Sequence, residues 1–210
     1  MAEHPHAMAT TTDSLTLRRR LSPGQMERRA RVLSTAAALA EAGGYEAVAM
    51  KDVADGSGVA LATLYRWFAS KDHLLAEVLL DWMSEIGAAI EIDPPDAVTA
   101  AERVVAVMQR IADAAGSRPR LAAALTQALL SFDAGVWDSE VDFHSGMAAW
   151  IDTAIGPDAG LDRPIPDRDA VIEVLEHVCF SSLISLARGR DTPASLGARL
   201  ALTARLLLGS

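Results

Sequence analysis

The 210-residue sequence predicts an all-α protein with a small N-terminal helical head and a larger helical body. Hydrophobic residues make up 50% of the chain and aromatic residues only 5%. The abundant alanine and leucine favour helix, because these side chains lose little rotamer freedom there. Turn residues also divide the chain into segments with apolar residues at helical spacing.

The expected head covers residues 14–75 and follows a tail, residues 1–13, which is polar, without period and expected to be disordered. Ser22-Pro-Gly-Gln25 is a capping box with proline at the first helical position, so the first helix starts there and runs to Gly43-Gly44. A short helix over about 50–55, a glycine turn and a third helix over 61–68 follow.

The expected body covers residues 76–210. Ser70 is the expected N-cap of a fourth, linking helix that ends before Asp93-Pro94-Pro95. Turn signals divide the remainder into five more helices, over about 96–115, 119–133, 138–155, 167–189 and 193–208, with one long loop over 156–166. The total is nine helices.

The formal net charge of −9 is unevenly distributed. Residues 14–75 hold nine Lys and Arg against six Asp and Glu, a net +3, which leaves −12 for the rest. Because phosphate binding depends on the local field of a basic face, this split is typical of a nucleic-acid-binding head on an acidic body.

Several other classes of protein are disfavoured. The single cysteine, Cys179, excludes an internal disulfide framework and fits a reducing cytoplasm. We expect no metal, no cofactor and no membrane span, since no zinc-ligand spacing occurs and charges interrupt each long apolar run. His144 and His177 lie on separate expected helices, and a thiol in an apolar stretch is more often core than nucleophile, so we do not expect an enzyme.

The segment over residues 50–68 has the plan of a helix-turn-helix, in which one exposed helix enters the major groove of DNA. Gly58 provides the positive φ that the tight turn needs. The expected packing residues of this unit are Val53, Ala54, Val59, Leu64 and Phe68.

Residues 50–75, MKDVADGSGVALATLYRWFASKDHLL, resemble the DNA-binding segment of the TetR family of transcriptional repressors. The V-A, G-V, T-L-Y, F and S-K-x-x-L-L elements have the family's spacing, and the nine helices agree with its plan. Ala49 and Ala60 depart from it, since the family commonly has hydroxyl-bearing caps there. Within the family, GGYEAVAM and the C-terminal LARGRDTPASLGARLALTARLLLG are similar to repressors of cholesterol-degradation genes.

The resemblance and the chemistry of the side chains together predict the DNA contacts. Thr63 and Arg66 are the polar candidates for base edges, and Leu61 and Ala62 for thymine methyls. The expected phosphate contacts are Tyr65, Trp67, Lys71, Lys51, Arg28 and the arm Arg18, Arg19 and Arg20. Two alternatives stay open: the arm as a merely solvated charge run, and Trp67 as a packing residue under the fourth helix.

The last two expected helices are apolar around most of their circumference, which implies two buried sides. A second copy of the chain is the simplest partner, in a two-fold four-helix contact. A fully interior helix hairpin is the alternative. The expected dimerisation residues are Leu175, Val178, Cys179, Leu183, Leu186, Leu196 and Leu200.

A repressor must be released, so the body is expected to hold a pocket whose occupancy changes the distance between two DNA heads. The candidate lining residues are Met108, Ile111, Leu125, Leu129, Phe132, Trp137, Phe143, Met147, Trp150 and Phe180. Such a surface suits a hydrophobic effector, by family resemblance a steroid, lipid or acyl-CoA thioester. The predicted function is a homodimeric repressor of a pseudo-palindromic operator; the alternative is a helical binding protein or enzyme whose head does not bind DNA.

Overall fold

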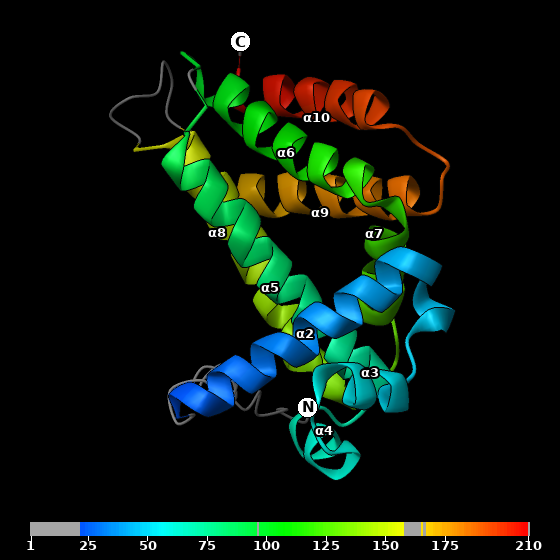
Figure 1. The fold of residues 1–210 in the computed structure, drawn as a ribbon. Helices are drawn as coiled ribbons and strands as arrows, with labels where there is room; N and C mark the ends of the chain where they lie inside the picture. Colours follow the sequence, from blue (N-terminus) through cyan, green and yellow to red (C-terminus); the bar gives the residue numbers. More distant parts are fainter. Residues whose placement is uncertain (1–21, 96, 158–164, 166, 210) are drawn as a thin grey trace, which may run out of the picture.

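The computed structural model describes residues 22–95, 97–157, 165 and 167–209. Within these residues the chain forms nine α-helices and two 3-10 helices without strands (Figure 1), which confirms the all-α prediction. The expected tail over residues 1–13 and the arm Arg18–Arg20 lie outside the described residues, as does most of the expected loop over 156–166.

The head consists of α2 (Pro23–Gly43), η1 (Tyr45–Ala47), α3 (Met50–Ser57) and α4 (Leu61–Trp67). The predicted capping box at the start of α2 is present, with Gln25 accepting a hydrogen bond from the backbone N–H of Ser22 at 2.9 Å. Gly58 follows α3 with φ 68°, as the turn between two short helices requires. The predicted packing residues of the helix-turn-helix are all buried.

Both short head helices begin without a side-chain cap, at Ala49 for α3 and at Ala60 for α4. Both residues are exposed and have extended backbone angles that serine also adopts. We expect Ala49→Ser and Ala60→Ser each to raise the free energy of unfolding by about 1 kcal/mol. Urea denaturation measures the change, and no gain from either variant would contradict it.

The body is made of α5 (Lys71–Ile92), α6 (Ala100–Ser117), α7 (Pro119–Leu129), η2 (Ala134–Val136), α8 (Trp137–Ile155), α9 (Arg168–Ala187) and α10 (Pro193–Leu208). Ser70 caps α5 as predicted, accepting from the backbone N–H of His73 at 3.0 Å. The predicted 119–133 helix ends at Leu129, and η2 begins after Asp133, whose side chain accepts from the N–H of Gly135.

The head lies at one end of the molecule and α10 at the other, with α5 and α8 running between them (Figure 1). One hydrophobic cluster joins α2, α3 and α4 to α5 and to Leu121 and Leu125 of α7. A second cluster lies among α5, α6, α8, α9 and α10. Helix α5 contributes to both clusters. The expected boundary between head and body, at residue 75, falls inside this continuous helix.

Helix α9 is long and apolar enough to cross a membrane by length and composition, with a mean hydropathy of 1.6. The sequence had predicted that charges would interrupt every such run. Only 28% of its apolar window is buried in the structure. Much of the rest is partly buried, including Val171 and Phe180, and Val174 is the exposed large apolar side chain among the described residues of this helix.

Candidate DNA-binding head and effector cavity

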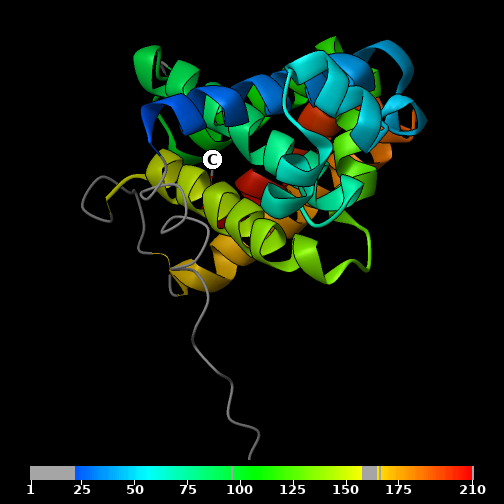
Figure 2. The ribbon, with the colours of Figure 1, turned by 60° about the horizontal axis from the view of Figure 1, so that its bottom comes forward.

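Helix α4 projects from the end of the molecule, and Figure 2 shows it in front together with α3. Its inner face is anchored by Leu64, which is fully buried. Of the residues predicted to meet DNA, Leu61, Ala62, Tyr65 and Arg66 are exposed and Thr63 is half-buried. The structure thus gathers the candidate base-reading side chains on one free helix.

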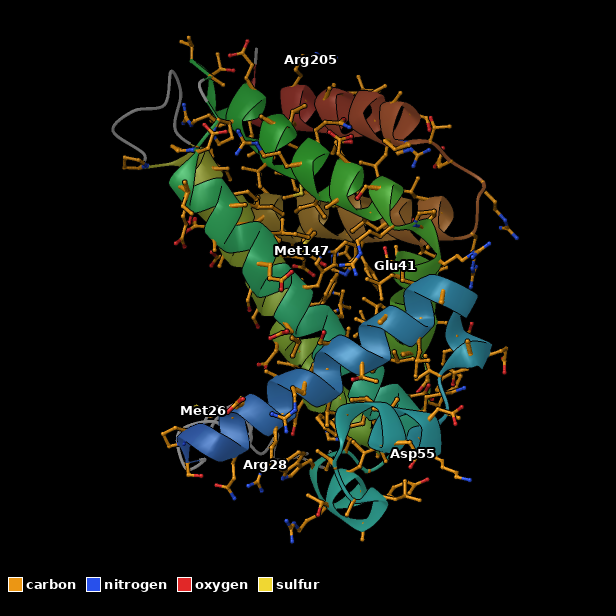
Figure 3. The ribbon with its side chains drawn as sticks, viewed as in Figure 1. Met26, Arg28, Glu41, Asp55, Met147 and Arg205 are labelled. Carbon is orange, nitrogen blue, oxygen red and sulfur yellow. The ribbon has the colours of Figure 1, made fainter. Side chains whose placement is uncertain are left out.

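The predicted phosphate contacts have different surroundings. Lys51 on α3 is exposed, and so is Arg28, which projects from α2 on the side of α3 and α4 (Figure 3). Lys71 instead lies 3.6 Å from the centre of the Tyr45 ring and donates to the Tyr45 carbonyl at 3.3 Å. Trp67 is half-buried against the head cluster, in agreement with its packing alternative.

A buried ion pair supports the end of α4. Glu77 of α5 is 3% exposed and pairs with Arg29 of α2, whose guanidinium lies 5.3 Å from the centre of the Phe68 ring. The hydroxyl of Ser139 on α8 donates to Glu77 at 3.2 Å. Phe68 is the C-cap of α4, so these contacts connect the body helix α8 to the predicted reading helix. These contacts were not predicted, because the partners are far apart in the chain.

His73 links α4 to α5, since its Nδ1 accepts from the backbone N–H of Ala69 at 3.2 Å. Burial lowers the pKa of His73 below its ordinary value of 6.5, and Arg29 lowers it further, against the opposing effect of nearby Glu77, Asp133 and Asp138.

The unfolded chain therefore binds a proton at His73 more readily than the folded chain. The stability contribution of neutral His73 is complete above about pH 6.5 and is lost as the pH falls through the lowered folded pKa. We expect the free energy of unfolding to fall less steeply between pH 7 and 5 in His73→Asn, which keeps an acceptor but does not titrate there. Urea titrations at several pH values test this; parallel pH profiles would contradict it.

An apolar cavity lies inside the body and is lined by five helices. The lining residues are Leu79, Trp82, Met83 and Ile86 of α5, Ile111 and Ala115 of α6, Ala122, Thr126 and Leu129 of α7, Phe143, Met147 and Trp150 of α8, and Phe180 and Leu183 of α9. Gly87 permits the close approach of Trp150, because an added Cβ would meet the Trp150 ring at 3.0 Å. Figure 3 shows Met147 in the middle of the body.

The void measures ≈ 50 Å³, which is room for a few water molecules. A larger ligand must therefore push its walls apart. Among the described residues, the polar side-chain groups at the lining are the Thr126 hydroxyl, which already donates to the Ala122 carbonyl at 2.7 Å, and the two indoles. No charged side chain of the described residues lines it.

The expected lining residues were partly misplaced. Six of them line the cavity: Ile111, Leu129, Phe143, Met147, Trp150 and Phe180. Phe132 and Trp137 are exposed beside η2, where the helix expected over 119–133 has already ended. Leu125 is buried in the cluster under the head and Met108 in the body core, so neither lines the cavity. Helix α5, which was expected only to link the head and the body, contributes four lining residues that were not predicted.

Comparisons with known proteins agree with this geometry. The profile of the bacterial regulatory proteins of the tetR family matches residues 32–78, and that of the tetracyclin repressor-like C-terminal domain matches residues 98–207. The HTH-type transcriptional repressor KstR of Mycobacterium tuberculosis is 35% identical over 90% of this chain and 84% of its own length. KstR of Rhodococcus jostii is 36% identical over 90% and 86%.

The chain belongs to the TetR family. A TetR transcriptional regulator from Rhodococcus sp. RHA1 has the same fold, with a TM-score of 0.76, 26% identity and coverage of 88% of this chain and 97% of that one. FadR of Bacillus subtilis, solved in complex with stearoyl-CoA, matches with a TM-score of 0.61 and 16% identity over 86% and 98%. Relatives named as transcriptional repressors point to a regulator and away from an enzyme.

The expected dimerisation residues of this TetR-family chain divide into three groups. Leu175, Cys179, Leu196 and Leu200 are buried in the protomer's own core, because these sides of α9 and α10 pack on the body. Leu183 lines the cavity. Val178 and Leu186 are partly buried. The exposed apolar residues of the two helices are others, Val174, Leu202 and Leu206, so the expectation chose mostly the inward faces.

A second hollow, an open groove of ≈ 580 Å³, lies between α8 and α9. Glu176 is buried beneath it and contacts Nδ1 of His144 at 2.7 Å and Nδ1 of His177 at 3.4 Å. A hydrogen bond to the Glu173 carbonyl and the charge of Glu176 raise the pKa of His177. In the described part of the chain, no three His, Cys, Asp or Glu side chains are grouped to hold a metal ion.

Proposed function

We propose that this TetR-family protein is a cytoplasmic homodimeric repressor that binds a pseudo-palindromic operator and is released by a hydrophobic small molecule. The observation that carries the proposal is the exposed face of α4, which is held by a buried anchor and carries a polar Arg66 beside apolar Leu61 and Ala62. A helix with free polar and apolar side chains of this kind is suited to base edges in the major groove.

Direct readout is assigned to Arg66, Thr63, Leu61 and Ala62. The guanidinium of Arg66 can bond O6 and N7 of one guanine together, and the apolar pair suits thymine methyls. Lys51, Arg28 and Tyr65 are proposed phosphate contacts that fix the register. Lys71 lies over the Tyr45 ring and donates to the Tyr45 carbonyl, so it joins η1 to the start of α5, and its remaining donors are proposed to reach a phosphate.

The proposed dimer forms through the outer faces of α9 and α10. Val174, Leu202 and Leu206 are exposed there, and Val178 and Leu186 are partly buried beside them. Pairing these helices with their symmetry mates gives a four-helix contact that covers the apolar surface of α9. Because α10 lies at the end opposite α4, the two reading helices remain free.

The proposed effector occupies the cavity between α5 and α9. Its lining is almost wholly hydrocarbon and indole, which selects an apolar molecule. The KstR relatives are repressors, and one structural neighbour was solved with stearoyl-CoA, so a steroid, a lipid or an acyl-CoA thioester is the proposed class. Since the void is smaller than any of these, binding moves the helices that support the head.

An operator-binding assay with the DNA upstream of the protein's own gene tests the proposal. The purified protein should be a dimer by analytical ultracentrifugation and should bind a two-fold symmetric site with half-sites about one helical turn, roughly 34 Å, apart or a little more. Affinity should fall steeply with salt, because phosphate contacts release counterions. A monomer, or binding without a symmetric site, would overturn the proposal.

A further inference from the structure

The cavity reaches the corner between α6 and α7. Ala115 in the last turn of α6 and Ala122 in the first turn of α7 both line it, and Arg118 is the residue between the two helices. The Arg118 guanidinium lies 5.6 Å from the centre of the ring of Trp82, another lining residue. Of the cation–π pairs among the described residues, this one alone involves the cavity wall.

Arg118 also connects the body to the head through hydrogen bonds to α2. Its Nε and Nη2 donate to the two carboxylate oxygens of Glu41 on α2, at 3.1 and 2.7 Å. Figure 3 shows Glu41 near the C-terminal end of α2, beside α7. Arg120 adds a second contact from the same corner, donating to the carbonyl of Ala42 at 2.9 Å. The hydrogen bonds and the charge of Arg118 lower the pKa of Glu41.

The pair of Arg118 and Glu41 is easily exchanged. The Arg118 side chain is 32% exposed and that of Glu41 48%, and ion pairs this exposed contribute little to stability. A second carboxylate therefore competes with Glu41 at small cost, provided that something holds it near the guanidinium. An apolar tail attached to this carboxylate and bound in the adjoining cavity holds it near the guanidinium. Burial of the tail supplies the affinity, and its position raises the local concentration of the carboxylate at Arg118.

Resting on the proposed function, we propose that the effector is an amphiphilic anion whose acidic group replaces Glu41 as the ion-pair partner of Arg118. The tail enters the cavity past Trp82, and the acidic group accepts the bidentate hydrogen bonds that Glu41 now accepts. The exchange removes a direct bond between the body and α2 while the tail spreads the walls. The cavity thus selects the apolar part of the ligand and Arg118 selects its charge.

Dodecanoate and dodecan-1-ol, which share a tail but not a charge, test this with the full chain. Quenching of the tryptophan fluorescence measures binding, and operator fluorescence anisotropy measures release. We expect dodecanoate to bind more tightly and to release the operator. Arg118→Gln should weaken dodecanoate about 10- to 100-fold and leave dodecan-1-ol nearly unchanged. Glu41→Gln should tighten dodecanoate a few-fold, since the competing charge is gone.

Arg110→Gln is the matched control, because Arg110 lies on α6, the helix that ends just before Arg118, and pairs with Asp93. Equal binding of the two probes, or dodecanoate binding that Arg118→Gln leaves intact, overturns the inference. Release of the operator by dodecan-1-ol would also overturn the inference, but it would not contradict the proposed function. Binding of neither probe overturns the inference as well. Failure of the wild-type chain to bind any operator defeats the proposed function instead, and the binding measurements still decide the role of Arg118.

Discussion

Arg66→Ala is expected to weaken operator binding about 30- to 10⁴-fold. A bidentate contact between arginine and guanine contributes about 1–3 kcal/mol to discrimination between bases, and a symmetric dimer loses two of them. Arg66 is exposed and no hydrogen bond or ion pair to it is found among the described residues, so the variant should unfold at the same denaturant concentration as the wild type. Fluorescence anisotropy with the operator measures the loss.

Two comparisons separate base reading from simple charge. Arg66→Lys keeps the charge but loses the planar fork, so it should recover only part of the affinity. Lys51→Ala should weaken binding to all DNA sequences alike and reduce the salt dependence, as expected for a phosphate contact. If Arg66→Ala lowered specific and non-specific binding equally, Arg66 would be a phosphate contact and the assigned reading role would be wrong.

The head was largely predictable because its signals are local. The capping box at Ser22, the cap at Ser70 and the positive φ of Gly58 each depend on a few adjacent residues. The same holds for the packing side of α4, since Leu64 and Phe68 follow helical spacing into the core. The missing caps at Ala49 and Ala60 were readable for the same reason.

The body was less predictable because the sequence of an apolar helix does not show which of its sides packs against the core and which is exposed. In α9, Leu175 and Cys179 point into the core and Val174 to the outside, yet all are equally apolar in sequence. Phe132 was placed in the cavity because a helix was expected to continue past Leu129. The chain instead leaves the helix there, and Phe132 lies exposed in the connection to η2.

Arg29→Ala is expected to lower the free energy of unfolding by about 3–5 kcal/mol. Glu77 lies inside the interface of α2, α5 and α8, and the variant leaves its buried carboxylate without the guanidinium. Desolvating a charge costs several kcal/mol, and only a close opposite charge with good hydrogen bonds offsets it. Urea denaturation measures the effect. Arg31→Ala, which removes an exposed pair with Glu27 and a long 3.5 Å hydrogen bond to the Ser57 carbonyl, should change stability by less than about 1 kcal/mol.

Removing both charges tests whether the pair stabilises the fold or positions the head. Arg29→Leu combined with Glu77→Leu should recover most of the stability that Arg29→Ala loses, because apolar side chains of similar volume replace a buried pair at little cost. Operator binding should not recover with it. The reason is that Arg29 lies over Phe68 at the C-cap of α4. Its partner Glu77 also accepts from Ser139 of α8, the helix that contributes Phe143 to the cavity lining. A double variant that bound the operator as tightly as the wild type would show that packing alone sets the position of α4.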